Sequence, residues 1–343
     1  MIRYDKYLNL SLKMINMIIK TKAPVRVSFG SAADTDYYIN LVGLGKGVNA
    51  TINKYSYCEI HPRIDNRIVL RSLETGHHLV FNSVDEITFN NRELNMMKAV
   101  VKHYGNSGIE VITYTDAPLE SGLGGSAAHA VAMIKAFNKL NGINASKEDV
   151  AKLAYHIERN ILGIEGGYQD QWAASHRGIN YLEFSKNGVK ITPIILDEKD
   201  IEYLEEHLLL VFVPRQASGN DIHRGQKKDS EESLSLLRMK LDCVEKIREC
   251  LVNKNFDDLG KFFHLDWKIK RQMTSLITNE YVDNIYKTAI EAGAEGGRLI
   301  GAGAGGAFIF WCEDKKKVLQ ALTPLGGREI KFKFERRGEI NEE

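Results

Sequence analysis

The chain has 343 residues, of which 43% are hydrophobic and 27% are charged. This composition is ordinary for a globular protein, and the length allows two domains with cores of their own. Because 46 basic residues nearly balance 45 acidic ones, bulk charge gives no reason to expect a nucleic acid or a membrane as partner, which favours a small-molecule substrate.

Four cysteines are scattered along the chain without a C-x-x-C pair, and no secretory signal pattern precedes the first strand pattern. We therefore expect a cytoplasmic protein. Residues 1–20 form an N-terminal extension of weak periodicity to which the sequence assigns no function. A homodimer is considered possible.

Alternating apolar residues predict several short strands before residue 120, at 25–29, 48–52, 57–62, 68–71 and 109–115. Apolar residues at helical spacing then predict a helix over 127–140. A second helix is expected over 150–162, opened by a capping box from Ser146 to Asp149. Strands followed by helices indicate an α+β fold.

The pattern starts again near residue 181, which predicts a second domain. Its expected elements are strands at 208–213, 307–311 and 330–334 and helices at 230–251, 256–264 and 281–292. We place the two domains at 21–187 and 188–343.

A glycine-rich loop leads directly into the 127–140 helix. It reads Ser121-Gly122-Leu123-Gly124-Gly125-Ser126-Ala127. Glycines let the backbone approach an anion closely, and the unpaired amides at a helix start attract phosphate. The motif is not a Walker A loop, because Ser126 and Ala127 stand where Lys and Ser/Thr are needed. The alternative is a tight turn whose glycines serve packing only.

A second glycine run, Gly301 to Gly306, satisfies G-x-G-x-x-G but is followed by an apolar strand instead of a helix. That context is wrong for a dinucleotide-binding fingerprint. We interpret the run as a loop that another loop or a ligand approaches closely, the alternative being a bulge or hairpin turn.

Two carboxylates follow the glycine-rich loop. Asp170 lies between two glutamines behind Gly166 and Gly167, where it could accept the proton of an attacking hydroxyl or instead cap the next helix. Glu158 is near a helix C-terminus, where the helix dipole disfavours a carboxylate, so a nearby cation is expected to compensate its charge. Mg²⁺ shared with Ser126 would be such a cation. The alternative for Glu158 is a solvated pair with Arg159 or Lys152.

Near the start of the chain, Arg26 lies on a predicted strand. The segment that leaves this strand, 30–37, consists mainly of small and acidic residues. An aspartate in this segment could accept sugar hydroxyls, and Arg26 could orient a nearby carboxylate. The alternative is a surface salt bridge at a strand end.

Together these motifs resemble the GHMP kinases, through Ala23–Phe29, Ser121–Ala128 and Gly301–Gly306 in that order. The resemblance implies a two-domain fold, with an N-terminal half like ribosomal protein S5 domain 2 and a ferredoxin-like C-terminal half. It also implies phosphoryl transfer from ATP, with phosphates on the loop at Ser121, Gly122, Leu123, Gly124, Gly125, Ser126 and Ala127. Ser126 and Glu158 would hold Mg²⁺, Asp170 would be the catalytic base or orienting carboxylate, and Arg26 would assist it.

Within that family the chain looks most like the heptose 7-phosphate kinases, through residues 166–174 and 47–52, while L-fucokinases share the Gln-Asp-Gln loop. The resemblance implies transfer to the anomeric C1 hydroxyl of a sugar phosphate, giving a 1,7-bisphosphate. The implied substrate-binding residues are Asp36, Gly167, Gln169, Arg215, Gly303 and Gly305.

Two departures from those kinases concern the acceptor. Ser31-Ala-Ala-Asp34 replaces a run of glycines with one extra residue, which reshapes the wall against the sugar. The segment 213–220 replaces a Thr-Gly and Arg-Ser pattern, so that either Arg215 stands in for that arginine or the loop binds differently. The alternatives are an L-fucokinase-like or other free-sugar 1-kinase and, in another class, a catalytically silent regulator that senses sugar and ATP.

Overall fold

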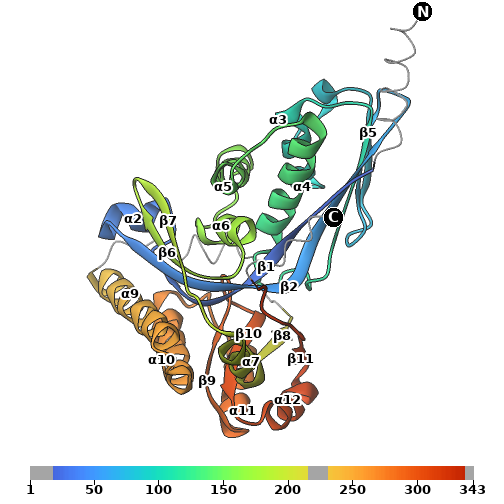
Figure 1. Cartoon of the computed structure of the whole chain (residues 1–343). Coiled ribbons are helices and arrows are strands. Elements are labelled where there is room, and N and C mark those ends of the chain that lie inside the picture. Colours follow the sequence, from blue (N-terminus) through green and yellow to red (C-terminus); the bar gives the residue numbers. More distant parts are fainter. Residues whose placement is uncertain (1–17, 215–230, 337–343) are drawn as a thin grey trace, which may run out of the picture.

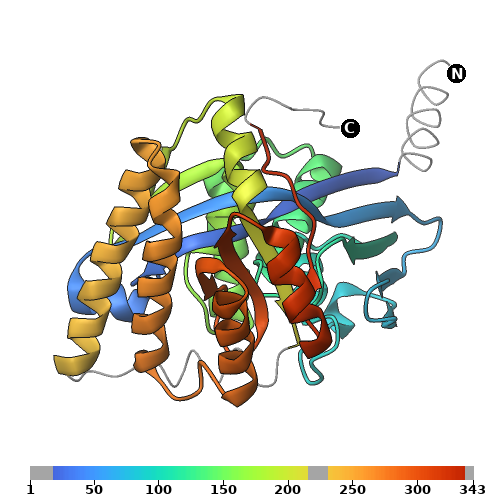
Figure 2. The ribbon, with the colours of Figure 1, turned by 90° about the horizontal axis from the view of Figure 1, so that it is seen from below.

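The structure, a computed structural model, describes residues 18–214 and 231–336. These residues form two β-sheets with helices packed on them (Figure 1). The first sheet carries helices on one face, and the second domain lies against its other face (Figure 1). The view from below shows α9 and α10 of the second domain running side by side (Figure 2).

The first sheet has seven strands in the order β4-β3-β5-β2-β6-β7, with β1 paired to β2. Its strands are β1 (Ile19–Ala32), β2 (Gly45–Pro62), β3 (Ile68–Ser72), β4 (His78–Phe81), β5 (Ile109–Thr115), β6 (Ile179–Ser185) and β7 (Gly188–Pro193). The helices of this domain are α2 (Asp36–Val42), α3 (Asn95–Tyr104), α4 (Gly125–Asn141), α5 (Lys147–His156) and α6 (Gln169–His176). The predicted capping box of Ser146 and Asp149 is confirmed, and a π-helical turn, η2 (Ile157–Ile161), extends α5.

The second sheet is antiparallel with the order β11-β8-β10-β9. Its strands are β8 (Leu208–Val213), β9 (Ala294–Leu299), β10 (Gly306–Cys312) and β11 (Arg328–Glu329). Its helices are α7 (Glu198–His207), α9 (Glu231–Val252), α10 (Leu259–Met273), α11 (Glu280–Glu291) and α12 (Lys315–Leu322). The predicted α+β class is therefore confirmed.

Two sequence expectations about the first domain need correction. The strands expected at 48–52 and 57–62 form one continuous strand, β2, whose two halves pair with β6 and β5. The domain boundary expected at 187/188 would cut the β6–β7 hairpin, so it moves to the segment between β7 and β8.

The strand expected at 330–334 is replaced by β11 and an isolated bridge between Ile52 and Phe334. Ile330 and Phe334 are both buried, and Phe334 pairs with the first sheet whereas β11 pairs with the second. The alternating pattern thus reflects a segment that crosses from one sheet to the other, which local periodicity cannot distinguish from a strand.

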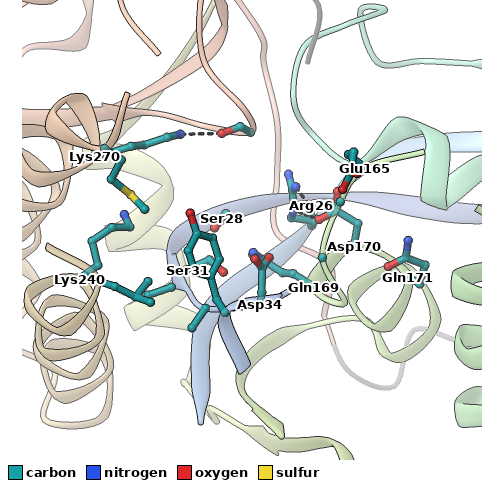
Figure 3. A pocket seen from close by; sticks show the side chains of 18 of the residues that line it. Arg26, Ser28, Ser31, Asp34, Glu165, Gln169, Asp170, Gln171, Lys240 and Lys270 are labelled. Atoms are coloured by element: carbon teal, nitrogen blue, oxygen red, sulfur yellow. Dashed lines mark hydrogen bonds and ion pairs between the residues drawn. The ribbon is translucent and has the colours of Figure 1, made fainter. Parts of the chain in front are cut away.

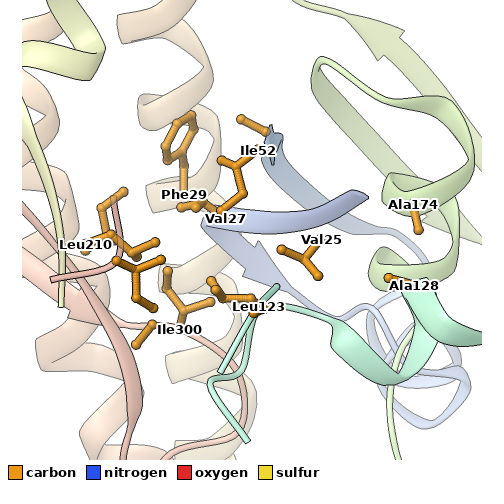
Figure 4. Close-up of a cluster of buried hydrophobic side chains, with 14 of the residues drawn as sticks. Val25, Val27, Phe29, Ile52, Leu123, Ala128, Ala174, Leu210 and Ile300 are labelled. Carbon is orange, nitrogen blue, oxygen red and sulfur yellow. The ribbon is translucent and has the colours of Figure 1, made fainter. Parts of the chain in front are cut away.

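One continuous core joins the two domains (Figure 4). Val27 and Phe29 on β1 and Ile52 on β2 meet Leu210 on β8 and Ile300 beyond β9, and each is at most 1% exposed. Burying a large apolar side chain contributes roughly 1.5–3 kcal/mol. This shared core therefore stabilises the two domains in one arrangement and fixes the loops between them.

β9 packs directly on α10 through a pair of glycines. A Cβ on Gly296 would lie 1.9 Å from the carbonyl oxygen of Gly260. We predict that Gly296→Ala lowers the free energy of unfolding by about 1–3 kcal/mol, as overpacked cores do. Urea denaturation measures this. Gly166→Ala, whose Cβ would meet no atom within 4 Å, is the matched control and should change stability by less than about 0.5 kcal/mol; equal stability for both variants would contradict the account.

Candidate active site

The glycine-rich loop leads into α4 and leaves the backbone amides at the start of this helix accessible. Gly122 and Gly124 both have φ +77°, a left-handed conformation that glycine adopts without strain. The first turn of α4 contains Ser126 and no acidic residue. The first amides of a helix have no partner within the helix and carry the positive end of its dipole, so this end can bind an anion such as phosphate.

The second glycine run supports this loop from behind. A Cβ on Gly122 would lie 2.7 Å from the carbonyl oxygen of Ile300, and the Ala307 amide donates to the carbonyl oxygen of Ser121 at 2.7 Å. The expected close approach of another loop is therefore observed. Gly303 instead faces Ile277, whose Cα would be 2.8 Å from its Cβ.

Arg26 connects β1 to both the loop and Asp170. Its Nε and Nη2 donate to Oδ1 of Asp170 at 2.9 and 2.6 Å, and its Nη1 donates to the carbonyl oxygen of Gly122 at 2.6 Å. Arg26 is only 5% exposed. It is therefore a buried positioning group, which excludes the alternative of a surface salt bridge.

Asp170 lies in the first turn of α6 but does not cap it. The N-cap residue is Tyr168, and no side chain makes a cap hydrogen bond there. The carboxylate instead faces the glycine-rich loop, because a Cβ on Gly124 would lie 3.3 Å from Oδ2 of Asp170. Its side chain is 33% exposed, so a substrate hydroxyl can reach it.

Glu158 lies in η2 and is buried against the start of α4. Its Oε1 accepts from the Ser126 hydroxyl at 2.7 Å, and its Oε2 accepts from the side-chain amide of Gln171. Burial raises the pKa of Glu158, the hydrogen bond from Ser126 lowers it, and the nearby Asp170 raises it further, so the pKa lies above its ordinary value. The alternative of a solvated pair with Arg159 or Lys152 is not observed among the described residues, since Glu158 is buried, Arg159 pairs with Glu165 and Lys152 pairs with Glu148.

These contacts fit a hard cation. A carboxylate and a hydroxyl side by side are the oxygen donors that Mg²⁺ takes, with phosphate oxygens and water completing its shell. A cation here would also stabilise the buried charge of Glu158. Among residues 18–214 and 231–336, no cluster of three or more His, Cys, Asp or Glu side chains could hold a metal by itself.

Two cavities meet at this point. The first, the glycine-loop cavity, is lined by Ser121, Gly122, Gly124, Gly125 and Ser126 together with residues of 115–120. The second, the β1 cavity, runs from the end of β1 past the 165–171 loop to α9 and α10. Both cavities are lined by Arg26, Glu158, Glu165, Asp170 and Gly301. Groups bound in the two cavities would therefore face each other at the carboxylate of Asp170.

The structure places the other expected residues as follows. Gly167 and Gln169 line the β1 cavity, and a Cβ on Gly167 would lie 2.4 Å from Cγ of Asp34. Leu123 and Ala127 are buried beneath the loop. Gly303 and Gly305 line neither cavity, whereas Gly301 lines both. Arg215 lies outside the described residues.

Asp36 is not brought to the cavity, and this expectation needs correction. Its carboxylate accepts hydrogen bonds from the hydroxyls of Tyr155 and Tyr168 at the start of α2. Asp34, two residues earlier, lines the β1 cavity instead. Thr35 caps α2, so the chain turns between the two aspartates and sends them to different surroundings.

Sequence reasoning also missed three cations that line the β1 cavity from the second domain, namely Lys240, Lys270 and Arg298. One signal could have revealed Lys270: it lies on the same face of α10 as Phe263 and Trp267, at helical spacing, and a charged residue on an apolar face is rarely buried without a partner.

Comparison with known proteins decides the family. The model for the GHMP kinases N terminal domain matches residues 91–178, and that for GHMP kinases C terminal matches residues 247–328. The chain is 33% identical over 333 residues, 93% of its length, to D-glycero-alpha-D-manno-heptose 7-phosphate kinase of Campylobacter jejuni, of which 97% is covered. The chain belongs to the GHMP kinases.

Solved structures agree with this assignment. A D-glycero-D-manno-heptose 1-phosphate kinase from Bacteroides thetaiotaomicron superposes with a TM-score of 0.77 at 26% identity, covering 93% of this chain and 96% of that one. Galactokinase of Lactococcus lactis shares the fold, with a TM-score of 0.73 at 18% identity over 96% and 98% of the two chains. The predicted two-domain GHMP kinase fold is thus confirmed.

As a GHMP kinase of the sugar-kinase type, the chain is a phosphotransferase with an alcohol group as acceptor. GHMP kinases use ATP together with a metal ion. This assignment sets aside a catalytically silent regulator. In the described part of the chain, no helix is long and apolar enough to cross a membrane.

We predict opposite effects of Glu158→Gln on stability and on metal binding. A carboxyl whose pKa is raised on folding destabilises the folded state above that pKa, so at pH 7 without metal the variant should be at least as stable as the native protein. Gln171 can turn its amide to suit the new group, since its Oε1 has no partner among the described residues. The stability difference should shrink as the pH falls through the pKa of Glu158.

Metal-dependent ATP binding by Glu158→Gln should weaken by about 10- to 100-fold. Thermal denaturation between pH 4 and 8 and ATP titrations with and without Mg²⁺ measure both effects. Glu148→Gln, which removes an exposed carboxylate paired with Lys152, is the control. Unchanged Mg²⁺ dependence in Glu158→Gln would refute the cation site.

Proposed function

We propose that the protein transfers the γ-phosphoryl group of ATP to the C1 hydroxyl of D-glycero-D-manno-heptose 7-phosphate, giving the 1,7-bisphosphate. The observation that carries this proposal is the meeting of the two cavities at Asp170. The sequence identity of 33% to the C. jejuni heptose 7-phosphate kinase, over 93% of this chain, supports this acceptor.

The glycine-loop cavity would hold the phosphates of ATP on the amides at the start of α4. Ser126 and Glu158 would hold Mg²⁺, which when bound neutralises charge on the phosphate oxygens. The main task of the protein in phosphoryl transfer is to position the reactants and to stabilise charge. A helix terminus, a cation and one carboxylate suffice for both.

Asp170 would receive or orient the proton of the attacking hydroxyl. Both hydrogen bonds from Arg26 to Asp170 go to Oδ1, so Oδ2 can accept a hydrogen bond from the attacking hydroxyl of the sugar. Arg26 also holds Gly122. The carboxylate and the phosphate-binding loop are therefore kept at a fixed separation, which is the geometric requirement for attack on a bound phosphoryl group.

The lining of the β1 cavity supports a polyhydroxylated acceptor. Ser28, Ser31 and Gln169 line it, and the two hydroxyls and Oε1 of Gln169 are buried without a hydrogen-bond partner among the described residues. Buried polar atoms are nearly always hydrogen-bonded. Sugar hydroxyls would satisfy all three, and Asp34 of the same wall would accept others.

A free-sugar 1-kinase is the second candidate, because the chain is 26% identical over 229 residues to the bifunctional fucokinase/GDP-fucose pyrophosphorylase of Arabidopsis thaliana. That match covers only 21% of the plant enzyme. The requirement for a phosphate on the acceptor separates the two candidates.

An ADP-release assay with Mg·ATP and a small acceptor panel tests the choice. The panel comprises heptose 7-phosphate, unphosphorylated heptose, mannose 6-phosphate, fucose, galactose and mevalonate. We expect turnover with heptose 7-phosphate to exceed that with every neutral sugar. Preferred turnover of fucose or another neutral sugar would move the function to a free-sugar kinase.

Location and oligomeric state remain predictions. The four cysteines are buried and unpaired, as is usual in a reducing compartment, and we infer a cytoplasmic protein on that basis. The possible homodimer can be tested by analytical ultracentrifugation.

We predict that Asp170→Asn lowers kcat by about 100- to 10,000-fold, the usual range for losing a general base. KM for both substrates should change little, because the side chain keeps its size and place. Steady-state kinetics measures both constants. Asp36→Asn is the matched control: it makes the same chemical change at a carboxylate that accepts from Tyr155 and Tyr168 and lines neither cavity, so kcat should stay within a few-fold. Full turnover by Asp170→Asn would eliminate the proposed mechanism.

A further inference from the structure

A buried cluster of charges forms the wall of the β1 cavity that belongs to the second domain. Lys240 on α9 and Arg298 on β9 both pair with Asp266 on α10, at 2.5 and 2.9 Å. Lys270, one turn beyond Asp266, donates to the carbonyl oxygens of Leu299 and Gly301 at 2.9 and 2.6 Å. The three cations line the cavity and none is more than 6% exposed.

Among the described residues, the second-domain wall of the β1 cavity carries more positive than negative charge. Burial by itself would raise the pKa of Asp266, but Arg298 and Lys240 lower it below its ordinary value, so the carboxyl is ionised. One carboxylate then faces three cations. Burying charge is costly unless opposite charge compensates it, so an anion on this wall would be strongly favoured.

The charges of the cavity are segregated. Its lining carboxylates Asp34, Glu158, Glu165 and Asp170 all belong to the first domain. Figure 3 shows Lys240 and Lys270 across the cavity from Asp170 and Arg26. A ligand that reaches from one wall to the other would meet the transfer carboxylate at one end and the cations at the other.

The cations are held in place before any ligand binds. Asp266 is fully buried between Lys240 and Arg298, and Arg298 also donates from Nη1 to the carbonyl oxygen of Ser28 at 3.0 Å. Cations fixed in this way lose little side-chain freedom when they bind an anion, and charge-assisted hydrogen bonds to phosphate are about twice as strong as neutral ones.

We propose that Lys240, supported by Arg298 and Lys270, binds the phosphate group that the acceptor carries at the end remote from the reacting hydroxyl. The inference rests on the proposed function and deepens it, since it assigns the preference for a phosphorylated sugar to this wall. Asp266 is the positioning residue of the cluster.

A purely structural role would give a different result. Arg298 and Asp266 tie β9 and α10 to β1, so the cluster could serve only to hold the two domains together. In that case its loss would lower stability and kcat for every acceptor alike. A phosphate site predicts that KM changes for phosphorylated acceptors only.

The experiment compares heptose 7-phosphate with unphosphorylated heptose in Lys240→Met. We expect KM for the 7-phosphate to rise by about 10- to 100-fold, the usual loss for one hydrogen bond to a charged group. We expect kcat and the kinetics with unphosphorylated heptose to change by less than a few-fold. Lys240→Arg, which keeps the charge, should retain most of the preference and serves if the methionine variant does not fold.

Lys246→Gln is the matched control. It removes a lysine from the same helix, where Lys246 is exposed and pairs with Glu249, and the preference should not change. An equal loss for both acceptors in Lys240→Met would overturn the inference in favour of a structural role. Loss of the phosphate preference in Arg215→Ala but not in Lys240→Met would also overturn it.

A direct binding measurement separates this inference from the proposed function. Should the native protein turn over no heptose phosphate, the proposed function fails. Calorimetric titration with inorganic phosphate then decides the inference. Binding that Lys240→Met abolishes supports the phosphate site, whereas no binding, or equal binding by both proteins, contradicts it.

Discussion

The guanidinium of Arg26 is the contact on which the geometry of the site depends. It is buried at the centre of β1 and bonds at once to Oδ1 of Asp170 and to the carbonyl oxygen of Gly122. An arginine can do this because its planar fork presents several donors in fixed directions, which a lysine cannot. The carboxylate of Asp170 and the glycine-rich loop are thereby tied to the same strand.

The strand itself is held by the core that the two domains share. Phe29, three residues beyond Arg26, lies among side chains of both sheets, and Ile300 leads into the glycine run that presses on Gly122. A change in the packing between the domains would therefore reach the loop as well as the carboxylate. Under the proposed function, the second domain would contribute to catalysis in two ways, by supporting the loop and by placing its cations in the β1 cavity.

Much of the site can be read from the sequence because its parts are local. The glycine-rich loop, the helix start at Ser126 and the Gln-Asp-Gln segment around Asp170 each lie within a few residues, so a local pattern singles them out, and the resemblance to the GHMP kinases implies their roles. Two features of the site cannot be predicted from the local sequence. Whether Asp34 or Asp36 faces the cavity depends on the turn at Thr35, and the role of Glu158 depends on burial by α4 and α6.

The cations of the second domain could not be found in this way. Lys240, Asp266 and Arg298 come from three elements, and their meeting is a product of tertiary packing that no local pattern encodes. For the same reason the strands β6 and β7 were missed, since their place in the first sheet is set by pairing with the distant β2.

The central claim is that a sugar phosphate bound between the two walls receives a phosphoryl group on its anomeric hydroxyl at Asp170. Phosphorus and proton NMR of the product formed from heptose 7-phosphate and Mg·ATP test it most directly. The account predicts a bisphosphate in which the new phosphorus is coupled to the anomeric proton. A product phosphorylated at another hydroxyl, or no sugar product under conditions where ATP binds, would contradict it.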